Sequence, residues 1–163
     1  MGLIAQTDGG GKDFEQVEEM MQGAVLADIV DKGMVPNKFK KAEPGQPVPM
    51  QHKCYFVWIV SEEDSEGRNK RVFESFTVSM NSKATLRKRY KELTGKKDAE
   101  IDAVKGGIEL DPLIGTKRYL ILSKEDGQNG QPFIKITATM KLSKGQSAPD
   151  IPADFVRRQD RTE

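Results

Sequence analysis

The chain has 163 residues, 36% hydrophobic and 31% charged, which suffices for one domain with a real core plus extensions. No apolar run approaches the roughly 20 residues that a membrane-spanning helix needs, and the short, uncharged N-terminus lacks the features of a secretory signal. The single cysteine, Cys54, excludes an internal disulfide. We therefore expect a cytoplasmic protein in a reducing compartment, with no membrane contact.

The net charge of +1 is unevenly distributed along the chain. Residues 1–22 carry five acids against Lys12, a net charge of −4, and residues 150–163 carry four acids against three arginines, a net of −1. Residues 23–149 therefore carry +6. A basic body with acidic ends is typical of a protein that binds a polyanion, although an ordinary solvated surface gives the same count.

The first half of the chain predicts three strands. Residues 1–22 are predicted to form a flexible acidic leader, with a short helix over residues 14–21. Residues 24–30 predict the first strand, and the proline-rich residues 34–50 predict a long loop. The strongest strand signal follows at residues 53–60, and residues 71–80 alternate as a third, antiparallel strand.

The second half predicts a helix followed by two strands. Residues 81–95 begin with the capping residues Asn81 and Ser82 and end at Gly95, which favours a helix. A second helical piece is predicted over residues 98–104 and a turn over 110–114. Residues 118–124 and 132–140 predict two strands joined by a hairpin turn, and residues 143–163 a flexible tail.

This order predicts a mostly β fold with one or two helices. Five strands with a helix between the third and fourth are the order of a five-stranded antiparallel OB-type barrel, here spanning residues 23–142. The alternative is a small antiparallel sandwich, which would not need a helix at that position.

Strand alternation separates a core face from a candidate binding face. In residues 53–60 the even positions Cys54, Phe56, Trp58 and Val60 are uniformly apolar, so they are assigned to the interior. The odd positions mix aromatic rings with cations, as proteins that bind single-stranded nucleic acid do. The predicted contact residues are Lys53, Tyr55, Val57, Arg71, Phe73, Ser75, Phe133 and Lys135, with Arg87 and Lys88 on the helix.

These residues also have ordinary interpretations. The outer aromatic residues could pack under the proline-rich loop or against a neighbouring subunit. The cationic helix could simply present a solvated face.

Catalytic motifs are missing from the sequence. Gly9-Gly10-Gly11-Lys12 has the wrong spacing for a phosphate-binding loop, and His52 is the only histidine, which excludes multi-histidine metal sites. Cys54 on an inward strand face is a poor setting for a reactive thiolate. We therefore expect a protein that is not an enzyme and that uses neither a metal nor a cofactor.

Several segments resemble small phage and prophage proteins related to OB-fold single-stranded-DNA-binding proteins. They are Gly23–Gly33, His52-Lys53 leading to Trp58, Phe76–Lys88 and Leu110–Gly115, so the resemblance covers about residues 23–145. The pattern is T-x-S, then K-A-x-L-R-K, then G-K. The resemblance implies a role in protecting or handing over single strands during phage DNA replication or recombination, in the host bacterial cytoplasm.

The resemblance also implies binding partners, but the residues of this chain do not identify them. Many proteins of this class end in an acidic tip with a terminal phenylalanine, whereas this chain ends Phe155-Val156-Arg157-Arg158-Gln159-Asp160-Arg161-Thr162-Glu163. Expected partners are single-stranded DNA, with RNA as the alternative, then replication or recombination proteins and a second copy of the chain. The competing functions are a phage adaptor or regulatory protein that grips another protein, and an accessory to an enzyme or an unrecognised catalyst.

Overall fold

The computed structural model describes residues 15–37, 42–127 and 130–161. Its strands are β1 (Met21–Pro36), β2 (Met50–Glu63), β3 (Asn69–Thr77), β4 (Lys117–Asp126) and β5 (Pro132–Met140). Its helices are α1 (Thr85–Thr94), α2 (Asp98–Asp102) and the short 3₁₀ turns η1 (Asp111–Leu113) and η2 (Arg158–Asp160). The strands form one antiparallel sheet in the order β3-β2-β1-β4-β5, with α1 between β3 and β4. This part of the predicted fold is confirmed.

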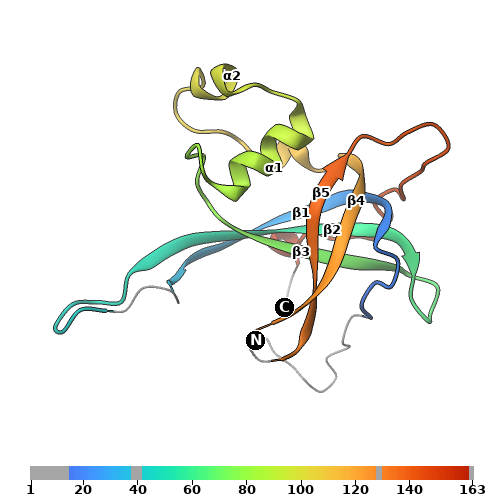
Figure 1. The fold of residues 1–163 in the computed structure, drawn as a ribbon, viewed down its shortest axis with the longest axis horizontal. Coiled ribbons are helices and arrows are strands. Elements are labelled where there is room, and N and C mark those ends of the chain that lie inside the picture. Colours follow the sequence, from blue (N-terminus) through green and yellow to red (C-terminus); the bar gives the residue numbers. More distant parts are fainter. Residues whose placement is uncertain (1–14, 38–41, 128–129, 162–163) are drawn as a thin grey trace.

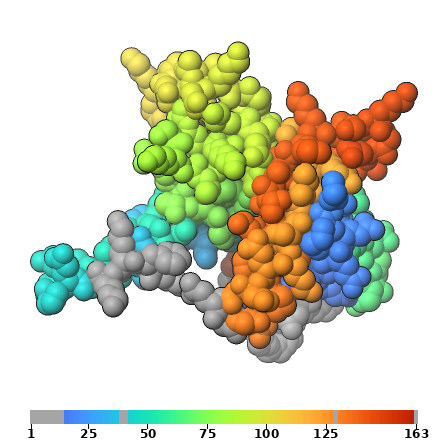
Figure 2. All heavy atoms as spheres, viewed as in Figure 1, coloured from blue at the N-terminus to red at the C-terminus, as the bar shows by residue number. Residues whose placement is uncertain are grey.

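Strands β1 and β2 form a long hairpin whose far end projects from the body (Figures 1 and 2). Their pairing runs from Ala24 opposite Val60 to Pro36 opposite Met50. It shifts register twice, the second time between Asp31 and Gly33, where Gly33 has a φ of 71°. Asp31-Lys32-Gly33 therefore bends the strand as a bulge and does not end it, so β1 is longer than predicted.

The main core lies on the inner face of the sheet, against α1. The even positions of β2 are buried as predicted, and Phe56 and Trp58 have no exposed surface. From α1, Leu86 and Tyr90 join this core. None of the helices in the described part of the chain is long and apolar enough to cross a membrane.

The sheet is not closed into a barrel. No strand pairing joins β3 to β5 within the described ranges, and these two edge strands instead flank α1. Arg89 of α1 connects them, because its guanidinium donates hydrogen bonds to the Glu74 carboxylate of β3 at 3.1 Å and to the Ile136 carbonyl of β5 at 3.2 Å. A side-chain bridge thus stands where a closed barrel would have backbone hydrogen bonds.

The segment before β1 packs on the domain. Residues 15–20 are not helical, so the helix predicted over residues 14–21 is wrong where it can be examined; Phe14 lies outside the described residues. Val17 is buried in the main core, and the backbone N–H groups of Glu18 and Glu19 donate to the Glu62 carboxylate, each at 2.9 Å. This carboxylate satisfies the backbone without a helix, so the domain begins before residue 23.

The segment after β5 also packs on the domain, in contrast to the predicted flexible tail. Ile151 and Phe155 cover a small apolar cluster on the outer face of β1 and β2, formed by Val25, Ala27 and Ile59. Near the start of this segment, its backbone passes close to Gly23 of β1. A Cβ added at Gly23 would lie 1.9 Å from the Ser147 carbonyl oxygen, so only glycine fits at this position.

Candidate nucleic-acid interface

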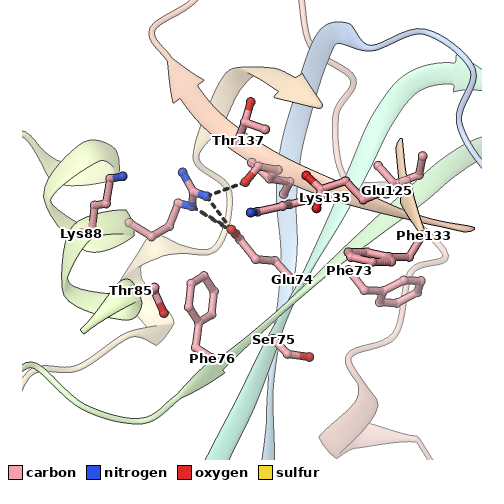
Figure 3. A pocket seen from close by; sticks show the side chains of 13 residues that line it. Phe73, Glu74, Ser75, Phe76, Thr85, Lys88, Glu125, Phe133, Lys135 and Thr137 are labelled. Carbon is pink, nitrogen blue, oxygen red and sulfur yellow. Dashed lines mark hydrogen bonds and ion pairs between the residues drawn. The ribbon is translucent and has the colours of Figure 1, made fainter. Parts of the chain in front are cut away.

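A cleft of 690 Å³ lies between the open edges β3 and β5, with α1 at one side (Figure 3). Strand β3 contributes side chains from both of its faces, because the cleft runs along the strand edge. The lining residues are Phe73, Glu74, Ser75, Phe76, Thr85, Lys88, Arg89, Glu125, Phe133, Ile134, Lys135, Ile136 and Thr137.

Two aromatic rings stand at one end of the cleft. Phe73 from β3 and Phe133 from β5 are each 43% exposed, and they lie near each other in Figure 3. Tyr55 on β2 extends this aromatic surface, because its ring meets Phe73 edge to face with centroids 6.2 Å apart. Exposed rings of this kind are platforms on which unpaired bases stack.

Cations border the same cleft. Lys88 on α1 and Lys135 on β5 are exposed, while Glu125 on β4 is the exposed acid of the lining. Ser75 and Thr85 add hydroxyl groups that can donate to phosphate or base atoms, whereas the Thr137 hydroxyl already donates to the Ile121 carbonyl at 3.0 Å. The cleft therefore combines aromatic surface, positive charge and hydrogen-bonding groups.

The floor of the cleft is held by an ion-pair network centred on Arg89. Besides Glu74, its guanidinium donates to Glu92 at 2.6 Å, and Glu92 accepts the Thr139 backbone N–H at 3.2 Å. Burial alone would lower the pKa of Arg89, but its bonds to Glu74 and Glu92 raise it above its usual range. Arg89 is thus fixed as a cation that positions both walls of the cleft.

The structure brings five of the ten predicted contact residues together in this cleft: Phe73, Ser75, Lys88, Phe133 and Lys135. Lys53 and Tyr55 are half-buried on the neighbouring strand, where they pair with Thr77 and Ser75. The outer face of β2 and β3 thus leads into the cleft.

Three predicted residues are placed differently. Val57 is only 5% exposed, so its assignment as a contact residue is wrong. Arg87 is buried, and it donates to Asp98, Asp102 and the Met80 carbonyl, which is a structural role. Those bonds to Asp98 and Asp102 raise the pKa of Arg87. Arg71 lies outside the cleft, with its guanidinium 5.4 Å from the centre of the Phe155 ring.

Cys54 and His52, the single cysteine and the single histidine of the sequence, do not line this cleft. Burial raises the pKa of the Cys54 thiol to about 11, so the thiol is protonated near neutral pH. His52 contacts Asp31 on the hairpin, with Nε2 and Oδ1 2.7 Å apart. No cluster of three or more metal-binding side chains occurs among the residues that the structure describes.

The sequence analysis missed Glu74 and Arg89 as the frame of the cleft. A local signal existed, because Glu74 is the one acid on the inner face of β3, where it lies between the apolar Val72 and Phe76, and such a residue needs a buried cation. The comparisons add no family assignment: neither the protein-family models nor the curated protein sequences contain a match to this chain.

Proposed function

We propose that this chain is a non-enzymatic single-stranded-DNA-binding protein with an OB-type, partly open barrel, acting in phage DNA replication or recombination. The strand order, and the edges β3 and β5 that face each other across the cleft, support the OB-type assignment. RNA is the alternative ligand, because base stacking and phosphate attraction do not distinguish the two sugars.

The observation that carries this proposal is the meeting of Phe73 and Phe133 with Lys88 and Lys135 in one cleft. Single strands are bound by aromatic surfaces for the bases and by cations along the backbone. Tyr55 beside Phe73 gives a second stacking position, and Lys53 lies two residues before it on the same strand face. The path of the strand would follow the outer face of β2 and β3 into the cleft.

Fluorescence anisotropy with a labelled dT oligonucleotide tests the proposal. Phe73→Ala and Phe133→Ala should each weaken binding by about 1–3 kcal/mol, the usual value of one base–aromatic stack. Both side chains are 43% exposed, so the thermal unfolding midpoint should change little. Val104→Ala is the control, because Val104 is 45% exposed and does not line the cleft. Unchanged affinity in both phenylalanine variants would contradict this site.

A second candidate is an adaptor that binds another protein. It is favoured by the projecting hairpin, where Met34 is 59% and Met50 is 50% exposed. The two residues share one face of the hairpin, because Met34 pairs with His52 and Pro36 pairs with Met50. The same titrations discriminate the two functions: a protein that binds no oligonucleotide at low salt contradicts the first and leaves the adaptor.

A further inference from the structure

A second pocket, of 620 Å³, lies between the β2–β3 turn and the segment after β5, which we call the C-terminal segment. Ile59 and the Phe155 ring give it apolar surface, and its polar side chains include three arginines and one acid. The residues that line it are Ile59, Gly67, Arg68, Asn69, Arg71, Pro152, Asp154, Phe155, Val156 and Arg161.

The three guanidinium groups come from separate parts of the chain. Arg68 precedes β3 and pairs with Glu66, while Arg71 lies within β3 and contacts the Phe155 ring. Arg161 comes from the C-terminal segment, where its Nε donates to the Val156 carbonyl at 3.2 Å. Arg161 forms no ion pair with a carboxylate in the described ranges.

The cations of this pocket repel one another. Burial lowers the pKa of Arg71, and the nearby charges of Arg161 and Arg68 lower it further, while Asp154 acts in the opposite direction. An arginine keeps its charge under such conditions, so an anion placed between the groups would lower the repulsion that remains beside Asp154 and the partners of Arg68. Guanidinium groups match phosphate oxygens in geometry and form paired, charge-assisted hydrogen bonds with them.

The pocket adjoins the surface that leads to the cleft. Arg71 and Phe73 are two residues apart on the outer face of β3, so their Cα atoms are about 7 Å apart. A nucleic-acid strand that stacks a base on Phe73 and continues along β3 would bring its next phosphates to Arg71.

We infer that this pocket binds a phosphate group of the strand held in the cleft, so that the C-terminal segment forms part of the nucleic-acid site. The inference rests on the proposed function, and it assigns binding roles to Arg68 and Arg161, which lie outside the cleft. It also gives a reason for the docking of the segment, because that docking places Arg161 in the pocket.

Titrations of a labelled dT oligonucleotide over a range of salt concentrations test this inference. Arg161→Gln and Arg68→Gln should each weaken binding about tenfold, as expected for one charge-assisted contact. Each should also reduce the slope of log K against log salt by about 0.7, the value for one phosphate on a single strand. Arg158→Gln is the matched control, because it removes the same charge from the same segment outside the pocket.

A second measurement separates a strand phosphate from free phosphate. Inorganic pyrophosphate is added to ¹⁵N-labelled protein, and the arginine Nε–Hε resonances are followed by NMR. Selective shifts at Arg68, Arg71 and Arg161, larger than at Arg158, support the pocket as an anion site. Equal or absent shifts at these arginines contradict it.

The two measurements also separate this inference from the proposed function. If Phe73→Ala loses affinity while Arg161→Gln keeps the parent affinity and salt slope, the pocket has no role in strand binding and the inference fails alone. If the parent protein binds no dT, the proposed function and the strand-phosphate role fail together. Selective pyrophosphate shifts in that case would identify a site for free phosphate only.

Discussion

At the scale of single residues, Glu62 shows how one side chain organises a segment far away in sequence. Its carboxylate accepts the backbone N–H groups of Glu18 and Glu19 and pairs with Lys70, whose side chain is 8% exposed. Desolvation alone would raise the pKa of Glu62, but Lys70 and the two N–H groups lower it below its usual range. The charged form of Glu62 is therefore the one that the fold stabilises.

This shift predicts a defined pH dependence. Because the pKa of Glu62 is lower in the folded than in the unfolded chain, its contribution to stability is complete above the ordinary glutamate pKa. The contribution is lost as pH falls through the lowered value. Glu62→Gln should cost about 3 kcal/mol of unfolding free energy at neutral pH, because Lys70 is left without its buried partner.

Urea unfolding between about pH 3 and pH 7 measures the effect of Glu62→Gln. The difference from the parent should shrink towards the acid end of this range. Glu63→Gln makes the same change of charge at an exposed neighbour and should unfold like the parent. A difference between Glu62→Gln and the parent that stays constant with pH would contradict the assigned role.

At the scale of elements, a buried ion pair attaches the C-terminal segment to β1. Asp28 is 2% exposed, and its carboxylate accepts the Arg157 guanidinium at 2.9 Å and the Arg158 backbone N–H at 2.7 Å. Arg157 also donates to Asp111 at 3.2 Å. One side chain thus connects the C-terminal segment to the strand β1 and to the turn η1.

Removing Arg157 should therefore release the segment. Arg157→Met leaves the Asp28 carboxylate buried without its cation, which should cost about 3–5 kcal/mol if the segment stays docked. We expect instead that the segment detaches, exposes Ile59 and becomes open to trypsin at Lys144. Limited proteolysis with mass spectrometry reports the cut, and urea unfolding reports the stability.

Arg158→Met is the control for this experiment, because Asp28 accepts the backbone N–H of Arg158, which the substitution retains. If trypsin cuts at Lys144 equally slowly in Arg157→Met and in the control, and the two variants are equally stable, then Arg157 does not anchor the segment. The double variant Asp28→Leu with Arg157→Met should recover part of the stability, because it removes the unpaired buried charge but leaves the Arg158 and Ile29 N–H groups without their acceptor.

The elements also show which parts of the fold local sequence can predict. Strand β5 is found at the predicted bounds, and α1 ends at Thr94 with Gly95 as its cap, in the left-handed conformation (φ of 73°) that glycine favours there. The predicted start of this helix is wrong, because α1 begins at Thr85 and neither Asn81 nor Ser82 caps it. Alternation in β2 correctly assigned Phe56 and Trp58 to the core. These features depend on neighbours within a few residues, so the sequence carries their signals locally.

The features that were missed depend on partners distant in the chain. The N-terminal segment is fixed by Glu62, and the C-terminal segment by Asp28, and neither pairing leaves a periodic pattern in sequence. Val57 follows the outward alternation of β2, but it is buried on that face. The two open edges of the sheet are bridged by Arg89, which in the sequence is one of several cations on a charged helix.

At the scale of the whole molecule, positive charge and exposed aromatic rings meet on one surface. Residues 23–149 carry +6, and Lys88 and Lys135 border the cleft in which Phe73 and Phe133 are exposed. Charge alone attracts any nucleic acid, whereas the rings can contact only bases that are not stacked within a duplex. The proposed site should therefore distinguish strand type through its aromatic rings.

We predict that a dT oligonucleotide binds at least about tenfold more tightly than a duplex of equal length at the same salt concentration. Phe73→Ala should reduce this preference, because it weakens single-strand binding and leaves duplex binding nearly unchanged. Lys135→Gln should weaken both and lower both salt slopes, since it removes a charge and no stacking surface. Lys144→Gln, outside the cleft, is the matched control for charge. Competition anisotropy measures the affinities of the parent and the three variants for both ligands. If the parent binds the oligonucleotide and the duplex equally tightly, its cations alone account for binding and the prediction is wrong.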